Sequence, residues 1–422
     1  MTLSAVGRKM SSASGIRSIM DDIAATSAAE PGEWRNLSIG NPAPIPEVRA
    51  TWLEMAAEAL DDDFAVASCQ YGASRGSPRL IDAIVDYFNE HYSWGIGPEN
   101  VVVGPGSQML CYLAAALYTE PAGGSRLVLP MLPDYAGYQG ISMHAAGVTG
   151  VPGLVDVEDE RHFRYQLDFP ALERIPGIGM LLLSSPSNPA GRSVTPDELG
   201  RLTELASHRQ VPLLIDHAYG QPFPRIAKTF APPSYHPNVI NCFTFSKAGI
   251  PGERIGFAIG DRRYVDDIVA FLANSFLHTP QLMQSAAARA LTTGRLDRLV
   301  DEVITPFYQS RREFAEKIVD DLLPSEVRWR VHSGSGGMFL WFWVDEDWFD
   351  DLTLYEQLKA RGVFIAPGSY FFTADQRESG PEDASADPHA RRCFRVSLSA
   401  GEDVLYEGMT RISDVMCMRR RP

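Results

Sequence analysis

The sequence predicts an α/β protein in which helices cover both faces of a largely parallel sheet, followed by a smaller α+β domain. Three observations lead to this prediction: short apolar runs between residues 95 and 260, helix-like segments between the runs, and a different pattern after residue 280. The apolar runs are continuous rather than alternating, which is typical of strands buried on both faces of a parallel sheet. With 422 residues the chain is long enough for two or three domains.

Six apolar runs are expected to form strands of this sheet, at 100–104, 126–130, 179–185, 211–216, 238–245 and 254–260. Between the third and fourth runs, residues 195–210 are expected to form a helix. Thr195 can cap its start, Pro196 suits its first position and Glu198 completes a capping box. Strand, helix and strand at this spacing form a βαβ unit, so ligands are expected beyond the carboxyl ends of the strands.

The pattern after residue 280 predicts the smaller domain, from helices at 281–304, 306–323 and near 354–362 and apolar strands at 338–344 and 393–399. We expect three parts in the chain: an N-terminal segment, 1–48, that packs with the small domain; a large domain, 49–290; and a small C-terminal domain, 291–422. Residues 373–391 are rich in Asp, Glu, Ser, Gly and Pro and predict a long loop. Both a functional lid and a plain insertion are open for this loop.

Composition excludes several classes of protein. The net charge is −15, from 38 Lys and Arg against 53 Asp and Glu, and an acidic surface repels nucleic acid. No stretch approaches the ~18 apolar residues of a membrane span, and the first residues contain no signal-peptide core. The five cysteines are scattered and form no CxxC pair, which is typical of reduced thiols. We therefore expect a soluble cytoplasmic protein that binds neither nucleic acid nor membrane.

The segment FTFSKAGIPGERIGF carries the first candidate for chemistry. Lys247 follows a predicted buried strand, where a lysine is costly to bury unless its amine is neutral or covalently used. Desolvation lowers the proton affinity of an amine and makes it a nucleophile toward aldehydes. Arg254, seven residues on, can hold a phosphate with its planar cation. Taken alone, a lysine at a strand end is more often a surface residue.

Two further strands are followed by polar side chains. In LLIDHAYG, Asp216 ends an apolar run, and a carboxylate there can face a cationic ring nitrogen, with Tyr219 three residues later. A turn or helix-capping aspartate is an equally good interpretation of Asp216 alone. In SSPSNPAG, the amide of Asn188 can donate to a phenolate oxygen, although most Asn-Pro pairs belong to plain loops.

The segment VVVGPGSQML predicts an anion site, because a strand leads into Gly106, Ser107 and Gln108 at the start of a helix. The backbone N–H groups there and the Ser107 hydroxyl can bind a phosphate. A dinucleotide fingerprint needs a third glycine where Met109 stands, so a nicotinamide fold is disfavoured. In PDYAGY, Tyr135 can stack on a flat ligand or simply pack in the core.

Taken in this order, the segments resemble those of the fold-type I aminotransferases, which use pyridoxal 5′-phosphate (PLP). The resemblance runs from Ser38-Ile39-Gly40-Asn41-Pro42 to Arg395. Within that family the chain looks most like the valine–pyruvate aminotransferases, in SGIRSIM, GNPAPIPE, DHAYGQPFP, SKAGIPGERIG, ITPFYQSR and LKARGVFIAPGSYFF. The resemblance implies a large domain with a mostly parallel seven-stranded sheet, a smaller α+β domain, and amino transfer between an L-amino acid and a 2-oxo acid.

The resemblance also implies the roles of the residues around the cofactor. Lys247 would hold PLP as a Schiff base and then move the proton at the substrate Cα. Asp216 would pair with the pyridine nitrogen and keep it protonated. Tyr219 and Asn188 would bind the phenolate oxygen, and Tyr135 would stack on the ring.

The remaining implied roles concern the phosphate and the substrate. The phosphate would be held by the segment that contains Gly106, Ser107 and Gln108, together with Thr244 and Arg254. Tyr71, in QYGASRG, would reach the phosphate of a neighbouring subunit, which implies a homodimer with shared sites. Arg395, in RVSLS, would bind the substrate α-carboxylate, helped by Gly40 and Asn188. No metal is implied.

Other functions remain to be weighed against this one. The same residues can support PLP-dependent elimination, replacement or carbon–carbon bond formation, and the sequence does not separate these from transamination. Residues 72–76 match GxSxG, but the segment before them is acidic rather than a buried strand, so a hydrolase is disfavoured. Asp61, Asp62 and Asp63 lack accompanying His or Cys, and a solvated helix end is favoured over a metal site.

The sequence makes two narrower predictions. No second substrate-binding arginine stands out, which favours a small or apolar amino acid such as valine or alanine. His217 stands next to Asp216 and is expected to pack rather than to act in the site.

Overall fold

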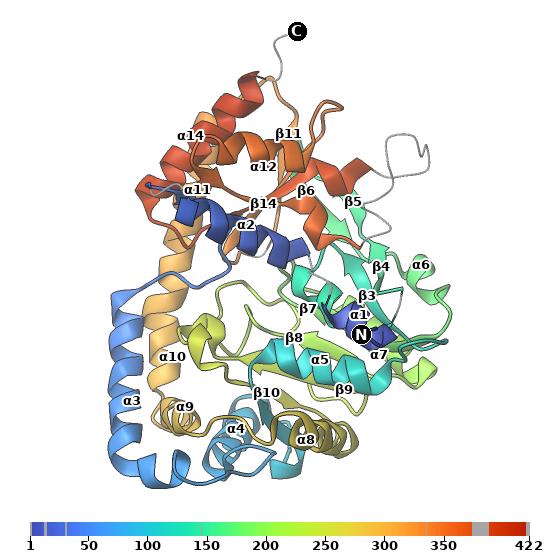
Figure 1. Ribbon diagram of the computed structural model, residues 1–422, viewed down its shortest axis with the longest axis vertical. Coiled ribbons are helices and arrows are strands. Elements are labelled where there is room, and N and C mark those ends of the chain that lie inside the picture. Colours follow the sequence, from blue (N-terminus) through green and yellow to red (C-terminus); the bar gives the residue numbers. More distant parts are fainter. Residues whose placement is uncertain are drawn as a thin grey trace.

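A computed structural model describes residues 2–11, 15–29, 32–144, 146–334, 336–373 and 388–418. Two sheets organise the molecule, with the larger sheet in the lower half of Figure 1 and the smaller one in the upper half. The larger sheet consists of β2 (Val101–Gly104), β3 (Arg126–Leu132), β4 (Thr149–Pro152), β7 (Ile178–Ser184), β8 (Leu213–Asp216), β9 (Val239–Thr244) and β10 (Gly256–Ile259).

The strand order of the larger sheet is β2-β10-β9-β8-β7-β3-β4. Its strands pair in parallel from β9 through β8, β7 and β3 to β4, while β10 is antiparallel to both of its neighbours. The predicted fold class is therefore confirmed, with a mostly parallel seven-stranded sheet. All six predicted apolar runs form strands, and β4 is an addition that the sequence analysis did not predict.

Helices cover both faces of this sheet, which explains why its strands are apolar on both sides. One hydrophobic cluster joins the sheet to α5 (Ser107–Tyr118), α7 (Pro196–Arg209) and α8 (Arg262–Phe276). A second cluster joins it to α3 (Pro46–Ala67), α4 (Pro78–Tyr92) and α9 (Leu282–Thr292). Within β2, Val102 belongs to the first cluster while Val101 and Val103 belong to the second, as the two-residue period of a strand requires.

The smaller sheet has the order β14-β15-β12-β11-β6-β5. Its strands are β5 (Leu154–Val157), β6 (His162–Gln166), β11 (Trp329–His332), β12 (Phe339–Val344), β14 (Ala366–Pro367) and β15 (Cys393–Ser397). Because β5 and β6 come from the middle of the chain, this sheet combines residues from both sides of the expected boundary at 290. The division of the chain into three parts at residues 48 and 290 stays a prediction.

Helices that follow the larger sheet carry the chain to the smaller one. Figure 1 shows α10 (Arg295–Leu299) and α11 (Thr305–Leu322) running from one to the other, with a π-helical turn, Val300–Ile304, between them. The smaller sheet packs with α12 (Asp351–Lys359) and α14 (Glu402–Met418). The short helix α6 (Phe169–Glu173) follows β6.

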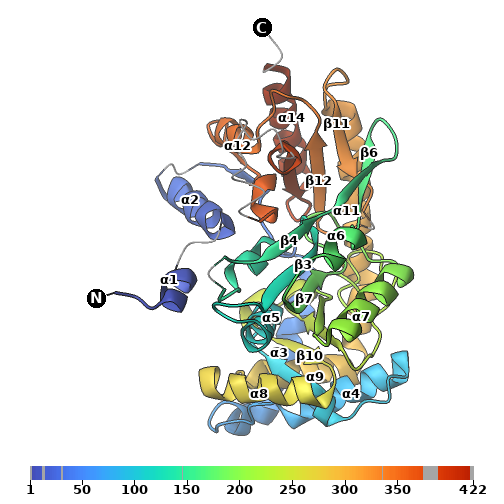
Figure 2. The ribbon, with the colours of Figure 1, turned by 90° about the vertical axis from the view of Figure 1, so that its right-hand side faces the viewer.

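The N-terminal segment lies against both halves. Strand β1 (Arg35–Asn36) pairs in parallel with β13 (Val363–Phe364), which places it beside the C-terminal part of the chain. Figure 2 shows α1 (Ala5–Ser11) and α2 (Gly15–Ala29) on one side of the molecule, with α2 at the height where the two sheets meet.

Two predictions of local structure have different outcomes. The capping box is confirmed: Glu198 N donates to Thr195 Oγ1 over 3.3 Å, and Thr195 N donates to Glu198 Oε2 over 2.9 Å. Within the predicted loop, residues 374–387 lie outside the described residues. In the described ranges, no helix combines the length and the apolar character that crossing a membrane requires.

The capping box yields a test of the fold. We expect Thr195→Ala to lower the free energy of unfolding by about 1 kcal/mol, because the first turn of α7 then loses an acceptor for one of its free N–H groups. Urea unfolding measures this change. Thr203→Ala, in the middle of the same helix, is the control, and an equal loss in both variants would contradict the role of the cap.

Candidate active site

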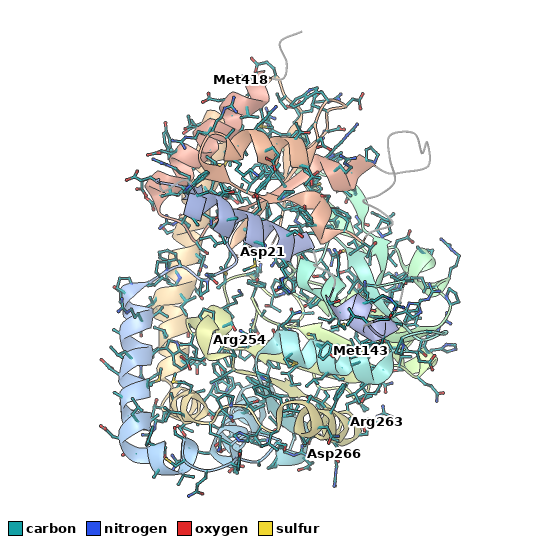
Figure 3. All side chains as sticks on the ribbon, viewed as in Figure 1. Asp21, Met143, Arg254, Arg263, Asp266 and Met418 are labelled. Carbon is teal, nitrogen blue, oxygen red and sulfur yellow. The ribbon has the colours of Figure 1, made fainter. Side chains whose placement is uncertain are left out.

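A cavity of about 470 Å³ lies where the carboxyl ends of β7, β8 and β9 face the smaller sheet. Its walls include most of the residues singled out in the sequence: Gly40, Ser107, Gln108, Tyr135, Asn188, Asp216, Tyr219, Thr244, Lys247, Arg254 and Arg395. Arg254, labelled in Figure 3, lies at the height of the larger sheet, in the lower half of the view. The expectation that ligand-binding residues follow the strands therefore agrees with the position of this cavity.

Lys247 lies in the short turn Ser246–Ala248 directly after β9. Its Nζ donates a hydrogen bond to the carbonyl oxygen of Gly40 over 2.6 Å. Burial and the nearby cations Arg395 and Arg254 together lower the pKa of Lys247 to about 8, against the opposing effect of Asp216. The amine therefore loses its proton more easily near neutral pH than an exposed lysine does, as a nucleophile requires.

Asp216 is the last residue of β8 and is buried. Its carboxylate accepts hydrogen bonds from the Tyr138 hydroxyl over 3.1 Å and from Ala218 N over 3.1 Å. Burial raises the pKa of Asp216 to about 6, while the hydrogen bonds from Tyr138, Ser107 and Ala218 oppose this increase. The carboxylate can therefore stay ionised near neutral pH and stabilise a positive charge in the cavity.

The start of α5 and the turn after Lys247 form one end of the cavity. Gly106 has a φ of +86°, and a Cβ built on it would lie 2.5 Å from Arg254 Nη2, so the backbone approaches the guanidinium closely only because this residue is glycine. The Thr244 hydroxyl donates to Ser246 Oγ over 2.9 Å on the same side. Free N–H groups at a helix start, hydroxyls and a guanidinium together suit a phosphate.

Arg395 lies on the other side, on β15 of the smaller sheet, and is buried. Its Nη1 donates to Asn188 Oδ1 over 2.8 Å and its Nη2 to the Ser38 carbonyl over 2.6 Å. Its Nε has no hydrogen-bond partner in the described structure. Burial lowers the pKa of Arg395 to about 10, which still leaves it charged at neutral pH.

Asn188 connects this arginine to the aromatic wall. Its Nδ2 donates to the Tyr219 hydroxyl over 3.2 Å. Tyr135 also lines the cavity, and its ring stands edge-on to Tyr138 with the ring centres 5.2 Å apart. Burial raises the pKa of Tyr219 well above its usual range, so its hydroxyl stays protonated and can donate.

Two predicted residues do not line this cavity. Gly106 is not among the lining residues, although a Cβ built on it would meet the guanidinium of Arg254. Tyr71 is 86% exposed and lines a different surface hollow with His278 and Gln281. Its predicted contact with a partner's site stays a prediction.

Several residues of the cavity were missed by the sequence analysis. Tyr138, Ser184, Ser246 and four residues of α2 (Ile19, Met20, Ile23 and Ala24) line it, as do Asn36 and Ser38. Ser246 stands next to Lys247 and Tyr138 lies in the PDYAGY segment, so both could have been found from those segments. The residues of α2 carry no local signal, because their position depends on how the N-terminal segment folds back.

The residues that suggested other kinds of site do not form one in the described structure. The His217 ring bonds to Asn241 Oδ1 over 2.9 Å and stacks on Phe243, with ring centres 4.9 Å apart, so it packs in the core. Residues 72–76 follow no strand. Asp62 and Asp63 both pair with Arg289. Among the described residues, no group of three or more His, Cys, Asp and Glu side chains could hold a metal.

The donor set fits PLP. The cofactor brings an aldehyde, a basic ring nitrogen and a phosphate, and the cavity offers an amine of lowered pKa, a buried carboxylate and an anion-binding end. Because residue 106 is a glycine, the backbone at the start of α5 lies close to the Arg254 guanidinium, which brings the helix N–H groups and the cation to the same end of the cavity. In addition, Gln108 Oε1 is buried without a hydrogen-bond partner in the described structure.

The pKa of Lys247 leads to a prediction about the protein freed of small molecules. Between pH 8 and pH 10.5, the pKa values of the folded and the exposed lysine, the unfolded chain binds more protons than the folded one. The contribution of Lys247 to the free energy of unfolding should therefore rise with pH across this window. We expect wild type to gain stability over Lys247→Met there, as measured by urea unfolding at several pH values. If the free energies of unfolding of wild type and Lys247→Met change in parallel between pH 8 and pH 10.5, the prediction is wrong.

Comparisons with known proteins show which family the chain belongs to. The family model for aminotransferase class I and II matches residues 34–408. The valine–pyruvate aminotransferase of Escherichia coli K12 is 31% identical over 97% of this chain and 99% of its own. The solved valine–pyruvate aminotransferase AvtA of Salmonella typhimurium LT2 is 29% identical, covers 96% of this chain and 99% of its own, and superimposes with a TM-score of 0.83.

A more distant structure shares the fold. The α-aminoadipate aminotransferase LysN of Thermus thermophilus, solved with N-(5′-phosphopyridoxyl)-L-leucine, is 22% identical and has a TM-score of 0.76. It covers 99% of this chain and 97% of its own. From the family match and the full-length similarity, the chain belongs to the aminotransferase class I and II family and is a PLP-dependent transaminase.

Proposed function

We propose that the protein transfers an amino group between a small or apolar L-amino acid, such as valine or alanine, and a 2-oxo acid such as pyruvate. The observation that carries this proposal is the contrast between the two sides of the cavity around Arg395. One side is a hydrogen-bonded pair, Arg395 and Asn188, suited to a carboxylate. The other is the apolar surface of α2, with Ile19, Met20 and Ile23.

The charges of the cavity support the same substrate class. Among the described residues that line it, the arginines are Arg254 and Arg395. If Arg254 holds the phosphate, Arg395 alone is left for the substrate, which suits one carboxylate rather than the two of aspartate or glutamate. The relatives named as valine–pyruvate aminotransferases support this choice.

The residues have complementary roles in this proposal. PLP, when bound, supplies an aldehyde for the amino group and a ring that accepts negative charge from the substrate Cα. Asp216 would stabilise the proton of the ring nitrogen through a buried ionic contact. Lys247 would attach the cofactor and would also remove the proton at the substrate Cα, so nucleophile and base would be one residue.

Binding and orientation fall to the other residues. The phosphate would be held by Ser107, Gln108, Thr244 and Arg254, which line one end of the cavity, with Gly106 beside Arg254. Arg395 fixes the substrate carboxylate, with Asn188 and the Gly40 backbone beside it, and so sets the direction of the Cα–H bond. Tyr135 and Tyr219 form the aromatic wall, and Tyr219 and Asn188 present donors for the phenolate oxygen.

We also propose a homodimer with shared sites in a reducing, cytoplasmic compartment. Support for the dimer comes from α3 and the loop after it, where Leu53, Phe64, Val66 and Tyr71 are all exposed. Apolar side chains gathered in this way are typical of a surface that a partner covers. Within the described structure none of the five cysteines forms a disulfide, which suits a reducing location.

The substrate proposal is tested by turnover. The purified holoenzyme should convert valine and pyruvate to 3-methyl-2-oxobutanoate and alanine, measured by chromatography of both amino acids. Lys247→Ala should lose at least about a thousandfold in rate, because it removes both the attachment point and the base. Lys228→Ala, at an exposed position, is the control. Faster turnover of aspartate or glutamate, or release of ammonia instead of alanine, would refute the proposal.

The shared site is tested by mixing two variants. Tyr71→Ala and Lys247→Ala should each be nearly inactive alone. Random exchange of subunits gives about half hybrid dimers, each with one intact site, so the mixture should recover about a quarter of the wild-type activity. Light scattering checks that dimers form. No recovery in a mixture shown to contain hybrids would mean that Tyr71 serves its own subunit or neither.

A further inference from the structure

Asp134 is a buried carboxylate to which no role has been given. It follows β3, directly before Tyr135, and is 3% exposed. Its Oδ1 accepts hydrogen bonds from Tyr135 N, over 2.7 Å, and from the Ser184 hydroxyl. Its Oδ2 accepts a hydrogen bond from Ser184 N over 3.0 Å. The carboxylate thus joins the carboxyl ends of β3 and β7, which are neighbours in the sheet.

Residues of the cavity are attached at both ends of this connection. On one side Tyr135 lines the cavity and is held through its backbone N–H. On the other, Ser184 Oγ accepts a hydrogen bond from Asn188 N over 3.3 Å. Asn188 in turn accepts from Arg395 Nη1. A single carboxylate therefore fixes the aromatic wall and, through Ser184, the amide that orients the arginine.

A third contact runs from Asp134 to the turn Gly368–Phe371, which follows β14 of the smaller sheet. Its backbone N–H donates to the Phe371 carbonyl over 3.1 Å, and the Phe371 ring centre lies 5.0 Å from the guanidinium carbon of Arg395. Asp134 itself does not line the cavity. It is therefore placed to act through other residues rather than on a ligand.

The chemistry of the site requires an acceptor at this position. Burial of a carboxylate is unfavourable unless donors compensate for lost water, and here three N–H and O–H groups do so. Burial raises the pKa of Asp134 to about 7, and the charge of Asp216 acts in the same direction. An asparagine has the same shape but only one acceptor oxygen, so at least one of the three donors would face an NH₂ group.

We propose that Asp134 is a positioning residue for the transamination site, which holds Tyr135 against the cofactor and, through Ser184, keeps Asn188 and Arg395 in register for the substrate carboxylate. The proposal rests on the function proposed above. It predicts that loss of the carboxylate weakens the binding of both cofactor and substrate, beyond what a general loss of stability would cause.

The chain offers a matched control. Asp351, at the start of α12, is fully buried and accepts hydrogen bonds from Leu352 N over 2.9 Å and from Ser369 N over 2.8 Å. Like Asp134, it combines the next backbone N–H with the N–H of a distant serine. None of these residues lines the cavity. Asp351→Asn therefore measures the structural cost of the same substitution away from the site.

The experiment compares Asp134→Asn with Asp351→Asn. Thermal unfolding should show similar losses of stability in both. The dissociation constant of PLP from the apoenzyme, measured by fluorescence quenching without substrate, should rise roughly tenfold only in Asp134→Asn, and KM for valine and for pyruvate should rise by a similar factor. If both variants change stability alike and keep PLP affinity and KM within about twofold of wild type, the proposal is overturned.

A second variant covers the case in which Asp134→Asn does not fold. Ser184→Ala keeps the carboxylate and its hydrogen bond from Tyr135 N but removes the acceptor for Asn188 N, so it should raise KM for both substrates and weaken PLP binding less than Asp134→Asn does. If KM is unchanged in Ser184→Ala, the connection through Ser184 is overturned.

A double variant tests the same connection where both single variants fold. Adding Ser184→Ala to Asp134→Asn should raise KM by a smaller factor than adding Ser184→Ala to wild type.

The two proposals fail in different ways. If wild type does not convert valine and pyruvate, the proposed substrates are wrong, whereas PLP affinity, read without substrate, still decides the role of Asp134.

Discussion

Two opposite charges held away from water at the ends of neighbouring strands are the constraint on which this site depends. Asp216 ends β8, Lys247 follows β9, and the two strands pair in parallel, so their carboxyl ends lie side by side. Burial raises the pKa of Asp216 and lowers that of Lys247, which brings both groups toward neutral pH. Hydrogen bonds of Asp216 with Tyr138 and Ala218, and of Lys247 with the Gly40 carbonyl, offset part of the loss of water.

The second requirement is that two sheets meet at this edge. Arg254 lies just before β10 of the larger sheet, whereas Arg395 comes from β15 of the smaller one. The N-terminal segment lies between them and offers the Ser38 and Gly40 carbonyls to Arg395 and Lys247. The cavity therefore depends on the relative position of both halves of the chain, and the hydrogen bonds around Asn188 and Asp134 are among the contacts that join them.

Much of the fold follows from local patterns. The continuous apolar runs predicted the strands of the larger sheet, because residues such as Val101 and Val102 must both be buried when helices cover both faces. The start of α7 followed from Thr195 and Glu198 alone. The membership of β5 and β6 in the smaller sheet did not follow, since nothing in a short strand shows which sheet edge it joins. Among the site residues, Lys247 and Asp216 stood out because charge after an apolar run is costly, whereas Tyr138 and Ser184 are ordinary core residue types.

The sequence by itself determined the strands, the capped helix, and the candidate amine, carboxylate and anion-binding segment, since each depends on neighbours within a few residues. Only the tertiary structure decided which of these groups meet. Asn188 and Arg395 are 207 residues apart, and their contact depends on strand order and on how the two sheets pack. The position of α2 over the cavity and the hydrogen bonds of Asp134 also depend on how distant segments pack together. Hydrophobic patterning specifies which face of a segment is buried, but not which distant segment will cover it.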